Sequence, residues 1–127
     1  MFLNFNELIN LNTEFLGKNI SGLFTIPSGI VTTATSIIQA TFDDIPQIGV
    51  ITTKSVGLES RAGNREPVYS QYAPGCFVNA VGLTNPGASV AAELMADLKV
   101  PEDRFLLTSI FGGSVEEFVE VAKIMAP

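Results

Sequence analysis

Three short apolar runs recur along this chain. They cover residues 23–26, 48–53 and 105–110, and each is followed within a few residues by proline, lysine or glycine. The run at 48–53 is continuously apolar rather than alternating, which is typical of a strand in a parallel sheet covered on both faces. The pattern therefore predicts three buried strands.

The first stretch with helical spacing lies between the first two strands, at about residues 34–42. Its threonines are poor helix formers, but the apolar spacing favours a helix that ends before the Asp-Asp-Ile-Pro sequence at 43–46. A turn is predicted at 18–22, where glycine and polar residues cluster. The side chains expected to face inward from the first helix are Ile37, Ile38 and Phe42.

Two further helices carry recognisable starting signals. Asn85 suits the N-cap of the second helix and Pro86 suits its first position. Ser114 and Glu117 have the spacing of a capping box at the start of the third helix. The apolar stripe predicted for the second helix is Val90, Leu94 and Leu98, and that for the third is Val115, Phe118, Val119, Ala122 and Met125.

The resulting order is β-α-β, a long loop, then α-β-α, which predicts an α/β fold with parallel strands and right-handed crossovers. The loop, residues 57–78, is long enough to suggest a functional role, with a short hairpin around 68–72. Three βα units are too few to close a barrel of roughly 250 residues. Two interpretations stay open on pattern alone, a small open α/β domain or the N-terminal part of a (β/α)8 TIM barrel. Either way, residues 1–127 are predicted to form one domain.

Composition removes several classes of function. The 127 residues are 46% hydrophobic and 16% charged, with a net charge of −6 and no basic run, so nucleic acid is an unexpected partner. Histidine is absent, which excludes histidine-based catalysis and most zinc sites within these residues. One cysteine permits no internal disulfide and fits a reducing compartment. Neither a signal peptide nor a transmembrane segment is apparent, so we expect a cytoplasmic protein.

Lys54 is the most suggestive single residue. It ends the second apolar run and precedes the long loop, which leads to an Asn/Gly-rich turn and a helix. Such an arrangement is one way in which α/β barrels bind anionic ligands or cofactors. A solvated lysine at a strand end is the commoner explanation when this feature stands alone.

Four motifs in fixed order carry a family resemblance. They are Ile26-Pro27-Ser28-Gly29, Ile51-Thr52-Thr53-Lys54-Ser55, Leu58-Glu59-Ser60-Arg61-Ala62-Gly63-Asn64 and Asn79-Ala80-Val81-Gly82-Leu83-Thr84-Asn85-Pro86-Gly87. Their order and spacing resemble the N-terminal half of the class 1 dihydroorotate dehydrogenases, which are FMN-dependent (β/α)8 barrels. The likeness runs from about Gly22 to the end of the chain.

The resemblance implies roles for particular residues. FMN contacts are expected from Ser28, Gly29, Lys54, Ser55 and Ser109. Lys54 would also reach the substrate, together with Asn79, Ala80, Val81, Gly82 and Leu83. For Asn79 the competing explanation is an ordinary turn asparagine, and for Ser28-Gly29 an ordinary strand-to-helix turn.

The chain also departs from the family pattern. Ser60 stands where the family usually has proline, and Val68 where it has arginine, which puts the substrate in doubt. The family's catalytic base lies on a later loop, so none is expected among these residues and it would lie beyond Pro127. Cys76 does not match it.

The resemblance implies a flavin-dependent oxidoreductase that converts dihydroorotate to orotate in pyrimidine biosynthesis. Its expected partners are a dihydroorotate-like small molecule, the remaining half of the barrel in the same or another chain, and further copies in a homo-oligomer. The alternatives are a non-catalytic half-barrel assembly module and an FMN barrel enzyme acting on another dihydropyrimidine.

Overall fold

A computed structural model describes residues 12–30 and 32–126. These residues divide into two compact units, which are described separately. The first runs up to Lys54 and includes Asp97–Ser109, and the second comprises Ser55–Ala96 with the residues from Ile110 on. The prediction of a single domain stays a prediction.

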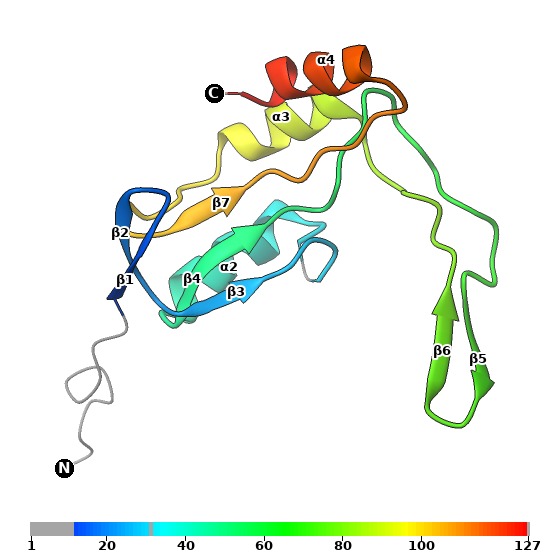
Figure 1. The fold of residues 1–127 in the computed structure, drawn as a ribbon, viewed down its shortest axis with the longest axis horizontal. Coiled ribbons are helices and arrows are strands. Elements are labelled where there is room, and N and C mark those ends of the chain that lie inside the picture. Colours follow the sequence, from blue (N-terminus) through cyan, green and yellow to red (C-terminus); the bar gives the residue numbers. More distant parts are fainter. Residues whose placement is uncertain (1–11, 31, 127) are drawn as a thin grey trace. The chain divides into compact units, whose positions relative to one another are not determined.

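A three-stranded parallel sheet with the order β3-β4-β7 forms the centre of the first unit (Figure 1). Its register pairs Thr25 with Val50 and Val50 with Phe105. The three predicted strands are confirmed, although each is shorter than its apolar run suggested. Their bounds are β3 Phe24–Ile26, β4 Ile48–Thr52 and β7 Phe105–Leu107.

The predicted first helix is confirmed as α2, Thr35–Asp44. It buries Ile38 and Phe42 against Ile51 of β4. The prediction that Ile37 faces inward is wrong, because its side chain is 46% exposed. The buried positions are spaced at i, i+3 and i+4, and Ile37 lies one residue, about 100° of helical rotation, before that stripe.

An antiparallel hairpin precedes the sheet. It consists of β1, Asn12–Phe15, and β2, Lys18–Ser21. The turn predicted at 18–22 is therefore wrong, since the chain reverses at Leu16-Gly17, with φ of 50° and 76°. Two positive φ values match the right-handed strand twist in a two-residue hairpin. Leucine is rare in this conformation, so the residue type at position 16 did not indicate a turn.

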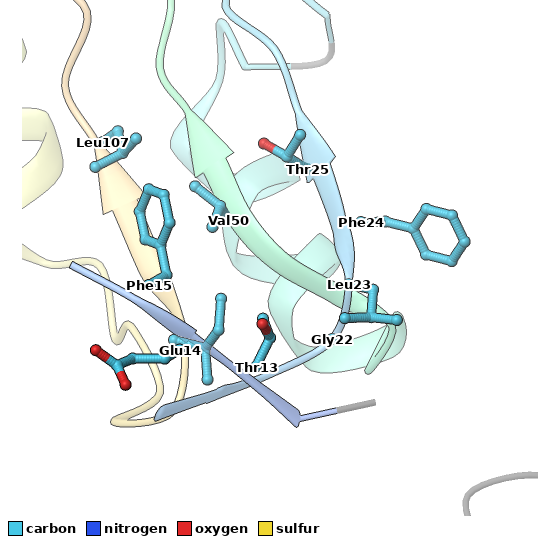
Figure 2. Close-up of a pocket in the computed structure, with 10 residues that line it drawn as sticks. Thr13, Glu14, Phe15, Gly22, Leu23, Phe24, Thr25, Val50 and Leu107 are labelled. Atoms are coloured by element: carbon cyan, nitrogen blue, oxygen red, sulfur yellow. The ribbon is translucent and has the colours of Figure 1, made fainter. Parts of the chain in front are cut away.

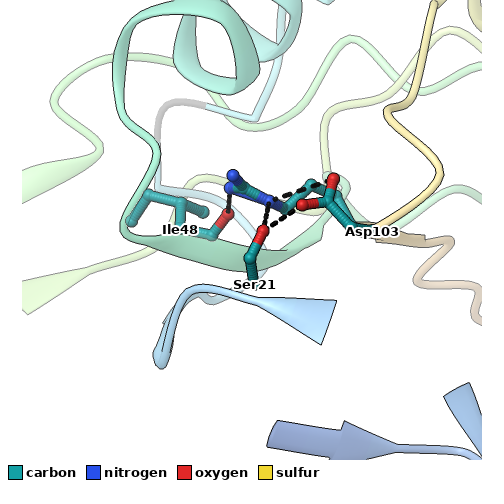
Figure 3. Close-up of polar contacts among 4 residues, drawn as sticks. Ser21, Ile48 and Asp103 are labelled. Carbon is teal, nitrogen blue, oxygen red and sulfur yellow. Dashed lines mark hydrogen bonds and ion pairs between the residues drawn. The ribbon is translucent and has the colours of Figure 1, made fainter. Parts of the chain in front are cut away.

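Arg104 links three elements of the first unit (Figure 3). Its Nη1 donates to the carbonyl of Ile48 at 2.7 Å, and its Nε donates to Ser21 Oγ at 3.2 Å. Ser21 donates in turn to the carboxylate of Asp103, and its backbone N–H donates to the Asp103 carbonyl at 3.1 Å. The turn before β7 is thereby attached to β2 and to the start of β4.

The second unit has two helices that share a small apolar core with residues following Lys54, and a largely exposed hairpin. The core contains Val56, Ala88, Ala91 and Val121. The hairpin predicted around 68–72 is confirmed and extends further than expected. The bounds are β5 Tyr69–Ala73, β6 Cys76–Asn79, α3 Ala88–Ala96 and α4 Val115–Met125.

The predicted start and stripe of α3 are wrong. The helix begins at Ala88, and the Gly87 carbonyl accepts its first helical bond, from the N–H of Ala91. Asn85 is therefore not the N-cap; its side chain bonds elsewhere in the loop. Val90 and Leu94 are about half exposed, at 47% and 52%. Alanines form the buried face because small side chains let α3 approach its neighbours closely, and Leu98 lies outside the helix.

The start of α4 is confirmed, and most of its predicted stripe is wrong. The Ser114 hydroxyl accepts from the N–H of Glu117 at 3.2 Å, as an N-cap does. The Glu117 carboxylate accepts from the N–H of Gly113 at 2.7 Å, so the reciprocal half of the box closes one residue earlier than predicted. The buried face contains Val121, Ile124 and Met125, while Val115, Phe118, Val119 and Ala122 are exposed.

Candidate functional site at the carboxyl edge of the sheet

Parallel strands present their carboxyl ends at one edge of a sheet, and polar residues follow each strand there. Ser28 and Gly29 follow β3, Lys54 follows β4, and Ser109 follows β7. Four of the predicted cofactor residues are therefore brought to the same edge of the first unit. In α/β proteins this edge is where ligands bind.

Two buried threonines fix the backbone at this edge. Thr53 is fully buried; its N–H donates to the Leu107 carbonyl at 2.9 Å, and its hydroxyl accepts from the N–H of Ser109 at 3.1 Å. Thr32 is 2% exposed; its hydroxyl accepts from the N–H of Gly29 at 3.0 Å, and its carbonyl accepts from the N–H of Lys54 at 3.2 Å. The sequence predicted a role for neither; for Thr53 the available signal was its position immediately after a buried strand.

Lys54 has a half-buried position beside Gly29. A Cβ built on Gly29 would lie 4.0 Å from Lys54 Nζ, and Gly29 has a φ of +84°. Among the residues that the structure describes, no carboxylate lies within ion-pair distance of Lys54. The lysine thus offers a positive charge at the sheet edge, next to a residue without a side chain.

The predicted substrate residues form one loop segment in the second unit. Asn79 is the last residue of β6, and the segment continues to Leu83. Gly82 and Leu83 both have positive φ, at +83° and +55°. Ser55 belongs to this second unit and directly follows Lys54 in the chain. Whether the sheet-edge residues and the 79–83 segment form one pocket stays a prediction.

A hollow lies in the first unit, away from the predicted residues. It has a volume of about 350 Å³ and lies between the β1–β2 hairpin and one face of the sheet (Figure 2). Phe15 contributes to it and packs edge-on against Phe105, with ring centroids 5.3 Å apart. Thr25, Val50 and Leu107 line it from the sheet. Its lining is mainly apolar, so it lacks the convergent polar groups of the strand-end site.

The described residues contain no group of three or more Cys, Asp or Glu side chains that could hold a metal ion. Nor does any helix in the described part of the chain have the length and apolar character needed to cross a membrane.

A parallel sheet with polar residues at its carboxyl edge is typical of α/β proteins that bind ligands at that edge, in barrels and in open sheets. The sequence profile of the family described as Dihydroorotate dehydrogenase matches residues 10–127. The chain belongs to the dihydroorotate dehydrogenase family, as the sequence motifs predicted. That family binds FMN and has the TIM-barrel fold, which implies that the βα units seen here correspond to part of such a barrel.

Several curated relatives carry the name dihydroorotate dehydrogenase B (NAD(+)), catalytic subunit. The one from Archaeoglobus fulgidus is 35% identical over 111 residues, which cover 87% of this chain and 35% of the relative. The one from Methanocaldococcus jannaschii is 39% identical over 80 residues, covering 61% and 26%. The one from Anoxybacillus flavithermus is 39% identical over 88 residues, covering 66% and 27%. The chain thus spans about a third, or less, of the length of these relatives.

Proposed function

We propose that this chain supplies part of the FMN and substrate pocket of an enzyme that oxidises dihydroorotate to orotate in pyrimidine biosynthesis. One observation carries the proposal: Ser28, Gly29, Lys54 and Ser109 meet at one sheet edge in a member of this family.

The chemistry of these residues fits FMN. Gly29 leaves space beside Lys54 Nζ, so a flat ring can approach the backbone closely. The hydroxyls of Ser28, Ser55 and Ser109 are suited to the polar edge of the ring. FMN, when bound, supplies the hydride acceptor of the reaction. Lys54 would hold a fixed positive charge where negative charge develops on reduction, which favours the oxidation of the substrate.

The 79–83 segment fits the substrate. The Asn79 side chain presents two amide donors and an acceptor, which match the alternating carbonyl and N–H groups of a pyrimidine ring. Backbone N–H groups of Val81, Gly82 and Leu83 are suited to carbonyl and carboxylate oxygens, whereas the N–H of Ala80 donates to the Val68 carbonyl at 2.7 Å. None of these residues removes a proton, so the catalytic base is expected outside these 127 residues.

The test is FMN retention and turnover by the intact protein that carries this chain. We expect a yellow protein that oxidises dihydroorotate, assayed with NAD⁺ and with fumarate as electron acceptors and with other dihydropyrimidines as competing substrates. A flavin-free protein that cannot take up added FMN would contradict the proposal. Faster turnover of another dihydropyrimidine would change the substrate and keep the flavin role.

Lys54→Gln tests the central residue. We expect kcat for dihydroorotate to fall by about 100-fold, the effect of removing one preorganised charge at a reacting centre. Lys99→Gln is the matched control, because Lys99 is an exposed lysine of the same unit. Equal activity of the two variants would exclude Lys54 from the site.

A second candidate function is a half-barrel assembly module without catalysis. It is favoured by the exposure of Val90 and Leu94 on α3 and of Val115 on α4, and by the outer positions of β3 and β7 in their three-stranded sheet. Such surfaces suit the remaining half of a barrel or further copies in a homo-oligomer. An intact protein that associates stably but neither binds FMN nor turns over substrate would favour this function.

A further inference from the structure

Residues 61–64 of the long loop lie beside residues 81–85 in the second unit. The N–H of Arg61 donates to the Asn85 carbonyl at 2.9 Å, and the N–H of Asn85 donates to the Arg61 carbonyl at 3.0 Å. Further along, the N–H of Asn64 donates to the Val81 carbonyl at 3.0 Å. Residues 61–64 therefore form a short antiparallel support for the 79–83 segment and the residues that follow it.

The Asn64 side chain adds a second bond to that segment. Its Nδ2 donates to the Ala80 carbonyl at 2.7 Å, so Asn64 binds two successive carbonyls of the segment. The approach is close: a Cβ built on Gly82 would lie 2.8 Å from Asn64 Cγ and from Asn64 N. Only glycine at position 82 allows this packing, and its φ of +83° also favours glycine.

Asn85 holds the other end of the segment. Its Nδ2 donates to the Leu83 carbonyl at 2.8 Å, while its Oδ1 accepts from the N–H groups of Gly57 at 3.3 Å and Gly87 at 2.9 Å. The residue is 8% exposed. Leu83 has a φ of +55°, which is unfavourable for leucine and persists only when its surroundings impose it.

We infer that Asn64 and Asn85 are positioning residues that fix the orientation of the peptide groups in the 79–83 segment. The inference rests on the proposed function, in which this segment binds the substrate. In a trans peptide the N–H points opposite to the carbonyl. The carbonyls of Ala80, Val81 and Leu83 point at the two asparagines, so the N–H groups that follow them in the chain point away from the asparagines. The segment therefore presents donors, which select a ligand that carries acceptor oxygens.

Asn64→Asp is the sharpest variant. It preserves the size of the side chain and the backbone bond to Val81, but it replaces the Nδ2 donor with an oxygen facing the Ala80 carbonyl. Asn64 is exposed, so the substitution is expected to leave the protein folded. Asn19→Asp is the matched control, since Asn19 is an exposed asparagine of β2 in the other unit. Asn85→Asp is a second test, because it keeps both acceptor bonds and removes the donor to Leu83.

The first readout is amide hydrogen exchange in the intact protein without ligand, followed at the N–H groups of Asn64, Ala80 and Asn85, which are hydrogen-bonded in and beside the segment. We expect Asn64→Asp to speed exchange there by about tenfold, the loss of one hydrogen bond with some local repulsion, and Asn19→Asp to have no effect. The second readout is titration with orotate, followed by the flavin absorbance. We expect its Kd and the KM for dihydroorotate to rise about tenfold with FMN content unchanged.

The outcomes separate this inference from the proposed function. Unchanged exchange in Asn64→Asp and Asn85→Asp overturns the inference, whatever the enzyme does. Faster exchange with an unchanged Kd for orotate overturns the positioning role for the substrate. Faster exchange in the variants of a protein whose wild type binds no orotate supports the positioning of the segment and contradicts the proposed substrate.

Discussion

Lys54 at the sheet edge and the 79–83 segment in the loop are held in place by different kinds of interaction. Lys54 follows a strand in a parallel ladder, next to Thr53, which is fully buried. The 79–83 segment leaves the β5–β6 ladder after Asn79, and two asparagine side chains donate to its carbonyls. The position of Lys54 therefore depends on the apolar core, whereas the position of the 79–83 segment depends on a few polar contacts.

The largest effect is expected from a change in the apolar core that supports the sheet. Ile38→Ala removes a side chain that is 1% exposed and packs with Phe42 and Ile51, so we expect the free energy of unfolding to fall by about 2–5 kcal/mol. Ile37→Ala, the neighbouring residue of α2 at 46% exposure, is expected to cost about 1 kcal/mol or less. Denaturant unfolding of the intact protein measures both. Equal losses would show that α2 packs by a different face.

A smaller effect is expected in the loop. Gly82→Ala introduces a Cβ 2.8 Å from Asn64 at a φ of +83°, whereas Gly75→Ala at the hairpin tip has a similar φ, +73°, and no atom within 4 Å. The two variants share the backbone cost and differ only in the clash. We expect Gly82→Ala to be less stable than Gly75→Ala by roughly 2 kcal/mol, with faster amide exchange confined to the loop. Equal stability would mean that the loop relaxes away from Asn64.

The smallest effect is the pH dependence at the start of α4. Hydrogen bonds from its own backbone N–H and then from Ser114 lower the pKa of Glu116 below its ordinary value of 4.5. A lowered pKa in the folded state stabilises the protein above pH 4.5, and this contribution is lost as pH falls through the lowered value. Glu116→Gln should therefore flatten the acid limb of a stability–pH curve slightly, because the carboxylate is fully exposed. Glu120→Gln, on the same helix beyond its first turn, is the charge-matched control, and a flattening equal to that of Glu116→Gln would contradict a specific role for the helix start.

Rules that use only neighbouring residues predicted the strands and helix ends that depend on neighbouring residues. The continuous apolar runs predicted β3, β4 and β7, and the spacing of α2 predicted a helix within two residues of its observed ends. The N-cap role of Ser114 depends on residues three apart, and it was confirmed. The motifs that indicated the family were also read directly from the chain.

The errors arose where partners are distant in sequence. Val90, Leu94 and Val115 have helical spacing and are exposed, since the faces that α3 and α4 bury depend on which elements pack beside them. Asn85 has the residue type of an N-cap, yet its side chain bonds Gly57, 28 residues earlier. No local rule includes such a partner.

The candidate site shows the same division. The sequence by itself determined which residues carry charge, hydroxyl or amide groups at strand ends, with Lys54 foremost. Only the tertiary structure decided that Thr32 and Thr53 fix the backbone beside Lys54. Only the tertiary structure, too, decided that the Asn64 and Asn85 side chains donate hydrogen bonds to carbonyls of the 79–83 segment. The physical reason is that a strand end is set by local patterning, whereas a hydrogen bond between loops exists only after the chain has closed on itself.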